Sequence, residues 1–482
     1  MNVSTQFKGN DKVLLGFILA VLTFWLFANS MMNISPQMIE QLGVDSNSMN
    51  MAVSLAALFS GIFVVVIGGL ADSIGRVKIL RIGIYLSILG SLIIAFTPSG
   101  TFSQPMLLLG RALQGFSAAC IMPTSLGLVK LLWEGAERQR AVSFWSIGTF
   151  GGSGLSSLFG GIIASNMGWR WIFIFSALVA IIALLLIKDL PESKKENAGK
   201  YKPDFGGIIL FLIAMIGLEL FITKGNQFGW TSITTILLLI IALIFFFFFY
   251  KYERRSSIAF FDFSLFKNRI FSSAVTCNFL LNATSGILIV TLTLMQRGAF
   301  FTSQQAGFLT LGYAIAVIVF IRIGEKLLQH YGARKPMMWG SLIVVFAIIL
   351  LMQTHTMTTI YIIIASVGFT MFGLGLAFFA TPATDAALSN LPAEQSGAGA
   401  GIFKMASSLG AGLGVAISSG IFTTIVTSGN VIDLISSIFI GRQDNIVIRQ
   451  AAMIALGVCL LFAIVSFIVA YKMKIANKEL VQ

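Results

Sequence analysis

Long apolar runs dominate this sequence, and short polar or charged segments separate them. Of its 482 residues, 57% are hydrophobic and 11% are charged, whereas a water-soluble domain carries about 25% charged residues. A run of roughly 20 apolar residues is long enough to cross a bilayer as a helix. The strict apolar–polar alternation of a membrane β-barrel is absent from the sequence. The sequence therefore predicts an all-α polytopic membrane protein.

The apolar runs predict fourteen transmembrane helices. Each run ends at a charged segment or at a segment that contains proline or glycine. The predicted spans are 13–35, 50–70, 79–97, 105–126, 141–163, 170–188, 206–223, 232–250, 271–295, 305–323, 336–353, 359–380, 397–423 and 449–471.

The formal net charge of +13 is explained by orientation in the membrane rather than by a nucleic-acid partner. With fourteen spans, 26 of the 32 Lys and Arg residues fall on the side that carries both termini or at its helix ends. Arg111 lies within a span. This positive-inside bias places both termini in the cytoplasm of a multi-pass cell-membrane protein. The five residues predicted on the opposite side are Arg170, Lys224, Arg297, Arg442 and Arg449.

The sequence offers no signal for a cofactor, a metal or an enzymatic centre. The three cysteines lie in separate predicted helices without a C-x-x-C spacing, and no phosphate-binding G-x-x-x-x-G-K-[ST] loop is present. The two histidines, His330 and His355, fall in different loops. A membrane enzyme is therefore disfavoured.

Two long polar segments divide the predicted helices into six, two and six. The turn Gly75-Arg76-Val77-Lys78 is echoed by Gly332-Ala333-Arg334-Lys335, and both join the second and third helices of a six-helix group. Parallel repeats of this kind are typical of two-bundle transporters, whose substrate sites form between the halves, and they disfavour a passive channel. The predicted domains are an N-terminal bundle (1–188), a linker (189–205), inserted helices 7 and 8 (206–250), a second linker (251–270) and a C-terminal bundle (271–482).

The polar stretch GGLADSIGRVK, at 68–78, interrupts two apolar runs. Its glycines allow helices to approach closely, and Asp72 is expected to pair with a nearby arginine. A polar cluster of this kind can hold two helices together in one state of a transporter and release them in another. The alternative is a loop that is polar only because it faces the cytoplasm. The candidate gate residues are Gly68, Asp72, Gly75, Arg76 and Arg138.

This stretch resembles the signature G-x-L-A-D-x-x-G-R-K that the major facilitator superfamily carries between helices 2 and 3, with Lys78 one place late. LLLGRALQGFSAA (107–119) is similar to that family's helix-4 pattern, with Arg111, Gln114 and Gly115 in register. The resemblance implies the family's fold and a role of Arg111 in proton transfer. The alternative is a structural arginine that hydrogen-bonds helix 1.

GTFGGSGLSSLFGGII (148–163) resembles the antiporter motif of the same family, but Ser156 and Ser157 stand where the motif has Gly-Pro. Proline is the usual cause of a kink at such a position, so its loss predicts a straighter helix and weakens the inference of antiport. The Gly/Ser-rich composition still predicts close helix packing.

The phrases TFWLFANS, AACIMP, ERQRA, IRIGEKLLQ and FKMASSLG extend the resemblance to the fourteen-helix drug:proton antiporter branch, in particular its quinolone-efflux type. The resemblance implies a monomer in the bacterial cytoplasmic membrane that exports amphiphilic compounds, such as fluoroquinolones and cationic dyes, in exchange for protons and without a cofactor. Many relatives carry an aspartate in helix 1, where this chain has Ala28. Dications should therefore be poorer substrates than zwitterionic or neutral amphiphiles. The alternative within transport is export of one dedicated metabolite or lipid-like compound, with drugs as incidental cargo.

Proton coupling requires groups at membrane depth that can change their charge. Arg322 and Glu325 share a helix face, and Asp385 and Lys404 are placed to pair at the ends of sequential helices. Both pairs are equally compatible with static gate contacts. Glu219 lies in the insert near Lys224, where snorkelling to the outer interface is the favoured interpretation. The proton-coupling candidates are Arg111, Arg322, Glu325, Asp385, Lys404 and Glu219.

Substrate-pocket candidates are polar or aromatic residues at membrane depth within the two bundles. The two tryptophans among them are suited to stacking against a flat ligand. The candidates are Trp25, Asn29, Asn33, Gln114, Trp145, Asn278, Asn282 and Gln296.

Overall fold

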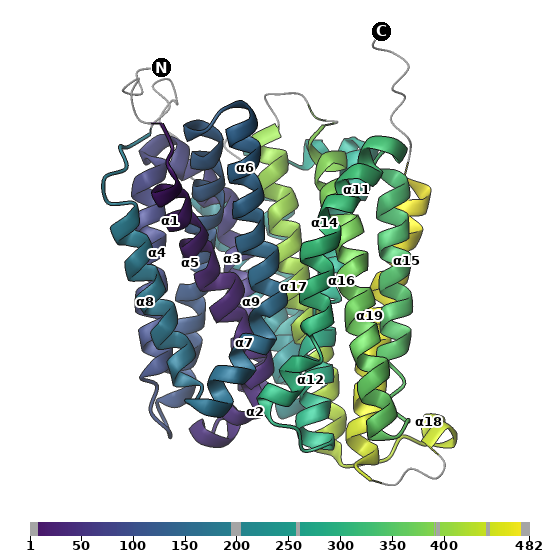
Figure 1. Ribbon diagram of the computed structural model, residues 1–482. Helices are drawn as coiled ribbons and strands as arrows, with labels where there is room; N and C mark the ends of the chain where they lie inside the picture. Colours follow the sequence, from purple (N-terminus) through teal and green to yellow (C-terminus); the bar gives the residue numbers. More distant parts are fainter. Residues whose placement is uncertain are drawn as a thin grey trace. The chain divides into compact units, whose positions relative to one another are not determined.

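The computed structural model describes residues 8–193, 204–256, 261–389, 391, 396–439 and 444–473. All regular secondary structure in these residues is helical (Figure 1). The helices cluster into two units, Met1–Phe260 with Phe301–Phe308, and Phe261–Phe300 with Leu309–Gln482. The two units are called unit 1 and unit 2 below.

Unit 1 contains the helices up to α10 together with the short helix α13. They are α1 (Asp11–Leu22), α2 (Met31–Leu42), α3 (Ser46–Ile74), α4 (Arg76–Ala95), α5 (Ser103–Leu132), α6 (Gly135–Ser146), α7 (Gly152–Asn166), α8 (Arg170–Leu186), α9 (Phe205–Phe228), α10 (Ile233–Glu253) and α13 (Ser303–Phe308). A π-helical turn (Thr23–Phe27) and a 3₁₀ turn (Ala28–Ser30) connect α1 to α2, so that they form one long span.

Unit 2 contains the remaining helices. They are α11 (Arg269–Ala283), α12 (Gly286–Gly298), α14 (Leu311–Tyr331), α15 (Arg334–Leu351), α16 (Thr358–Leu388), α17 (Ser396–Ser428), α18 (Asp433–Ser436) and α19 (Ile446–Lys472), with short 3₁₀ helices at Phe263–Lys267 and Ser437–Phe439.

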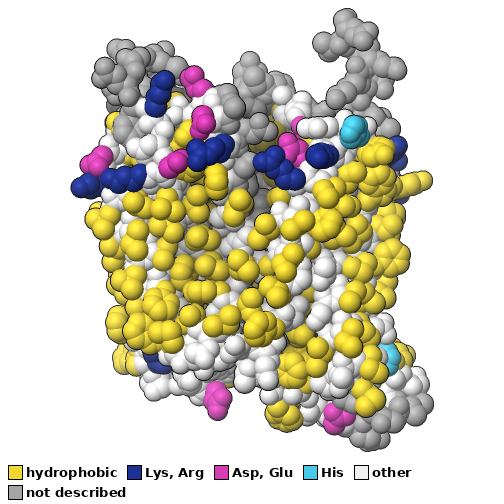
Figure 2. All heavy atoms as spheres, viewed as in Figure 1, with side chains coloured by type: hydrophobic (Ala, Val, Ile, Leu, Met, Phe, Trp, Pro, Cys, Tyr) yellow, Lys and Arg dark blue, Asp and Glu magenta, His cyan; other side chains and the backbone are white. Residues whose placement is uncertain are grey.

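Twelve spans in the described residues are long and apolar enough to cross a membrane. A thirteenth is counted if the bent pair Arg140–Thr149 and Gly152–Asn166 is one span, and α8 is a shorter apolar helix of 17 residues. In each unit, hydrophobic side chains cover the middle of the helices and Lys and Arg gather near one end (Figure 2). The all-helical polytopic fold is confirmed, and the number fourteen stays a prediction.

Helices within each unit approach closely at glycines. A Cβ atom on Gly90 of α4 would lie 2.9 Å from the carbonyl oxygen of Gly110 on α5. In unit 2 a Cβ on Gly340 of α15 would lie 2.6 Å from the carbonyl oxygen of Gly375 on α16. The same kind of contact therefore joins α4 to α5 in unit 1 and α15 to α16 in unit 2, as expected for helices that associate where no hydrophobic effect drives them together.

The helix that carries the proline-free antiporter-like motif is bent, which contradicts the expectation of a straighter helix. Its axis changes direction by 41° between Arg140–Thr149 and Gly152–Asn166, and a π-helical turn occupies Ile147–Gly151. A π turn interrupts the regular ladder of backbone hydrogen bonds and is a recognised cause of kinks. Glycines in this region also let the helix pack closely on the first span, since a Cβ on Gly152 would lie 2.9 Å from Leu22.

The short helix α13 packs on α7 and α2 within unit 1. A Cβ on Gly161 of α7 would overlap the carbonyl oxygen of Ser303, and a Cβ on Gly307 would lie 2.7 Å from the carbonyl oxygen of Ser157. Glycine is required at both positions because the obstructing atoms are backbone atoms.

Gly161→Ala should therefore lower the melting temperature of the detergent-solubilised protein, because overpacking costs about 1–3 kcal/mol. The control is Gly457→Ala in α19, where the nearest atom to a new Cβ is Met352 Cε at an ordinary 3.5 Å. There the melting temperature should stay the same or rise. Equal melting temperatures for the two variants would contradict the packing described for α13.

Candidate functional site

The turn between α3 and α4 is held by a residue that the sequence did not reveal. Gly75 has a φ of +130°, ends α3 and precedes α4. The backbone N–H groups of Val77 and Lys78 donate to the two carboxylate oxygens of Glu192, each at 2.9 Å. A Cβ on Gly75 would overlap that carboxyl group, so the turn needs glycine for its conformation and for space. Glu192 thus caps the N-terminus of α4, where a negative charge is stabilised by the helix dipole.

Two arginines near the start of α4 contact neighbouring backbone. The Arg76 guanidinium donates to the carbonyl oxygen of Gly127 on α5 at 3.4 Å, and Arg81 donates to that of Lys188, after α8, at 2.8 Å. Gly68 lies opposite Pro123, to which a Cβ would stand at 3.9 Å. The side chains of Asp72 and Arg138 lie outside the described part of the structure, so their predicted pairing stays a prediction.

Arg111 is buried in unit 1 and its guanidinium binds backbone oxygens of two other spans. Nε donates to Ala52 O at 2.8 Å, Nη2 to Val53 O at 3.0 Å and Nη1 to Ala28 O at 3.0 Å. Nη1 also donates to Gln114 Oε1 at 2.8 Å. The side chain is 2% exposed. The alternative of a structural arginine that hydrogen-bonds the first span therefore agrees with this contact, which Arg111 makes to the backbone of Ala28.

Gln114 continues this network to other helices. Its Nε2 donates to Ser91 Oγ of α4 at 3.2 Å, and Ser91 Oγ donates to Ser176 Oγ of α8 at 3.1 Å. The amide is buried and therefore serves helix packing in this structure.

The other pocket candidates of unit 1 have different environments. Asn33 is fully buried and its Nδ2 donates to Ser157 O at 2.7 Å and to Ser303 O at 2.8 Å, which ties the first span to α7 and α13. Trp145 Nε1 donates to Ser125 Oγ at 2.9 Å. Trp25 is half-buried, with its ring edge-on to Phe24, and Asn29 is half-buried in the 3₁₀ turn.

In unit 2, two of the candidate amides lie together. Asn278 Nδ2 donates to Phe403 O and Ser407 Oγ of α17, both at 2.8 Å, and Asn282 Nδ2 donates to Asn278 Oδ1 at 3.0 Å. Lys404 follows Phe403 on α17 and is half-buried. Gln296 lies near the end of α12 and is half-buried. The structure thus brings Asn278 and Asn282 together, next to the α17 segment that carries Lys404.

The carboxylates that were paired by sequence have other surroundings. Among the described side chains, no ion pair joins Arg322 to Glu325. Arg322 is exposed, whereas Glu325 on the same helix is half-buried. Asp385 is exposed and accepts a hydrogen bond from Ser389 Oγ at 2.7 Å. Their role in proton coupling stays a prediction.

The snorkelling interpretation of Glu219 is wrong. Glu219 is fully buried against α3, where its carboxyl contacts Ser54 Oγ. Lys224 is also buried and donates to Ser48 Oγ at 2.7 Å. The sequence did not show this because both residues turn toward another helix rather than toward the interface.

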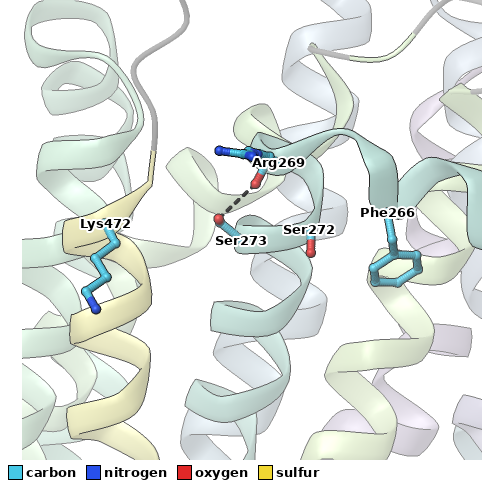
Figure 3. A pocket seen from close by; sticks show the side chains of 5 residues that line it. All are labelled: Phe266, Arg269, Ser272, Ser273 and Lys472. Atoms are coloured by element: carbon cyan, nitrogen blue, oxygen red, sulfur yellow. Dashed lines mark hydrogen bonds between the residues drawn. The ribbon is translucent and has the colours of Figure 1, made fainter.

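Unit 2 also has a cavity of about 250 Å³ where the start of α11 faces the end of α19 (Figure 3). Phe266, Arg269, Ser272, Ser273 and Lys472 line it, and Ser273 Oγ donates to the carbonyl oxygen of Arg269. None of the predicted substrate-pocket residues lines this cavity.

The family that the motifs indicated is confirmed. The chain belongs to the Major Facilitator Superfamily, whose sequence model matches residues 14–268. It is therefore a multi-pass membrane transporter and not an enzyme.

Curated relatives are similar over nearly the whole chain. The sequence is 45% identical to the quinolone resistance protein NorB of Staphylococcus aureus strain MRSA252, over 88% of this chain and 91% of that protein. The corresponding protein of strain Newman gives the same identity and coverage. These relatives are bacterial.

Solved structures show the same fold at low sequence identity. A D-xylose-proton symporter has a TM-score of 0.66 and 14% identity, and the match covers 97% of this chain and 98% of the other. An auto-inhibited POT family peptide transporter has a TM-score of 0.64 and 15% identity, and the match covers 98% of each chain. At this identity the likeness concerns the fold alone.

Glu192→Ala should destabilise the protein by about 0.5–2 kcal/mol, as the loss of a helix N-cap does. Hydrogen exchange should become faster at the amides of Val77 and Lys78, which lose their acceptors. Asp189→Asn is the matched control, because Asp189 makes an exposed ion pair with Lys12 at 3.7 Å. Unchanged exchange at Val77 and Lys78 in Glu192→Ala would contradict the cap.

Arg111→Lys separates the two roles assigned to Arg111. An ammonium cannot reproduce the planar fork that binds Ala28, Ala52 and Val53, and each buried acceptor left unsatisfied costs about 1–3 kcal/mol. The melting temperature should therefore fall together with transport. A variant that keeps the wild-type melting temperature but loses proton coupling would instead show that Arg111 acts mainly in proton transfer.

Proposed function

We propose that this protein exports amphiphilic drugs, fluoroquinolones among them, in exchange for protons and by alternating access. The observation that carries the proposal is the 45% identity to the quinolone resistance protein NorB over 88% of the chain. Retention of the gate-motif glycine Gly75 and the buried Arg111 supports it.

The proposal includes fourteen spans with both termini in the cytoplasm, arranged as six helices, a two-helix insert and six helices. The bent helix pair at 140–166 and the 17-residue α8 supply the two spans beyond the twelve long ones. A helix of 17 residues lies at the lower limit for spanning a bilayer. The gathering of Lys and Arg near one end of the helices in each unit supports the orientation.

The turn at Gly75 is proposed to be the cytoplasmic gate. Glu192 and Arg81 tie the start of α4 to the chain that follows α8, and Arg76 contacts α5. These contacts are polar and few, so they can break and re-form at low cost compared with the glycine-lined apolar contacts deeper in the unit.

The surroundings of Ala28 in the first span bear on which substrate charge the protein prefers. Ala28 is fully buried and its carbonyl oxygen accepts a hydrogen bond from Arg111. The cationic guanidinium of Arg111 therefore lies against the backbone of Ala28, the residue at which the resemblance would place an acid. This arrangement favours zwitterionic or neutral amphiphiles over dications.

The test uses purified protein in proteoliposomes with an imposed pH gradient. A fluoroquinolone should accumulate against its own gradient while protons flow the opposite way, and a dicationic dye should move more slowly. Empty liposomes and a protonophore are the controls. Glu325→Gln and Asp385→Asn, run alongside, test whether either candidate of unit 2 carries a coupled proton, in which case the proton flow per drug falls.

Equilibration of the drug without proton movement would contradict antiport and define a facilitator. No drug movement at all would favour export of one dedicated metabolite. Faster movement of the dication than of the fluoroquinolone would overturn the argument from Ala28 and Arg111.

A further inference from the structure

Glu219 is a carboxyl group buried between two helices of unit 1. It lies nine residues before the end of α9, which places it about 13 Å inside that helix end. Its exposed fraction is 0%. Oε1 contacts the hydroxyl of Ser54 on α3, and Oε2 has no hydrogen-bond partner among the residues that the structure describes.

The hydrogen bonds around Glu219 suit the neutral acid and not the anion. Ser54 Oγ lies 3.1 Å from both Asn50 O and Met51 O, so its own proton has an acceptor within α3. A protonated Glu219 can then donate to Ser54 while Ser54 donates to α3. An ionised Glu219 would have one donor at most, and a buried carboxylate with so few donors is strongly disfavoured.

The charged groups near Glu219 are engaged elsewhere. On its own helix, Lys224 bonds Ser48 and Gln227 and lies 3.6 Å from Asp45 at the start of α3. Burial alone would raise the pKa of Asp45, but hydrogen bonds from Ser48 and the charge of Lys224 outweigh it and hold the pKa below the ordinary value. Because its pKa is depressed, Asp45 stays ionised at neutral pH and its ion pair is lost only in strong acid.

The other helices near Glu219 offer no counter-charge in the described residues. On α10, the small side chain of Ala242 lies against Gly217, and the charged residues Lys251, Glu253 and the adjoining Arg254 are at the far end of that helix. From α5, Arg111 binds the carbonyl oxygens of Ala52 and Val53.

We propose that Glu219 is a proton-binding site through which the two-helix insert takes part in coupling. The inference rests on the proposed function and names one of its proton sites. With a proton bound, Glu219 docks α9 on α3 through Ser54. Loss of the proton leaves a carboxylate that cannot remain in this position, so α9 separates from α3 at this level.

The position of Ser54 on α3 connects this site to the gate. Arg111 holds α3 at Ala52 and Val53, the two residues before Ser54. The same continuous helix ends at Ile74, beside Gly75, about 30 Å further on. A shift of α3 on loss of the proton would therefore reach the gate turn directly.

Buried polar residues mark a route for the proton. Ser48, Asn50 and Ser54 are all buried on the first turns of α3, and they lead from the Asp45–Lys224 pair at the helix end to Glu219. In the proposed topology that end of α3 faces outward, which is the side from which an antiporter takes its protons.

The test compares Glu219→Gln, Glu219→Asp and Glu253→Gln in proteoliposomes. Glu253 is a matched control, since it is a second buried glutamate of the insert. Under a pH gradient of one unit, Glu219→Gln should lose about tenfold in drug accumulation, the gradient that one coupled proton supports. Glu219→Asp should retain part of it, and Glu253→Gln all of it. Wild-type accumulation in Glu219→Gln would overturn the inference while the proposed function stands.

Infrared difference spectroscopy gives a readout that does not depend on transport. Near neutral pH, wild-type protein should show the C=O stretching band of a protonated carboxyl group that disappears in alkali, and Glu219→Gln should lack this band. If the Gln variant does not fold, Ser54→Ala should shift the band, because the acid loses its acceptor. A spectrum in which neither variant changes the band would overturn the inference, even if the protein proves not to transport drugs.

Discussion

A buried guanidinium organises the first half of this transporter. Lipid offers no hydrogen-bond partners, so every donor of Arg111 must find an acceptor inside the protein. The guanidinium donates hydrogen bonds to carbonyl oxygens of the first span and of α3, and to the amide oxygen of Gln114. Three helices are thereby fixed at one depth by a single residue. Through Gln114, hydrogen bonds to Ser91 and from Ser91 to Ser176 continue this network to α4 and α8.

Helix α3 is the element on which the polar contacts of unit 1 converge. Asp45, the residue before α3, pairs with Lys224, and a few residues into the helix α3 contacts Arg111 and Glu219. At its end comes the Gly75 turn, after which Glu192 caps α4. Between these points its neighbours pack through glycine, as at Gly115 of α5, where a Cβ would overlap Ala56 O. Polar contacts can change partners more readily than close glycine packing can, so α3 is suited to move together with α5 as one rigid body.

The sequence predicts the positions of the helices well, but it predicts bends within helices and side-chain contacts between them poorly. Hydropathy placed the third span at 79–97 and the structure has α4 at Arg76–Ala95, because apolar length is a local property. The bend at Ile147–Gly151 was not predicted, because the π-helical turn that causes it contains no proline. Glu192 and Glu219 were missed or misread for another reason. Their partners are more than a hundred residues away, and nothing in a local pattern reports such contacts.

In the proposed function, the protein moves drug only in exchange for protons. The most direct test sets a drug gradient against a pH gradient across proteoliposomes and finds the pH difference at which net drug flux is zero. The account predicts that the flux reverses at a finite pH difference, which grows with the drug gradient. Flux that vanishes only when the drug concentrations are equal, whatever the pH difference, would contradict it.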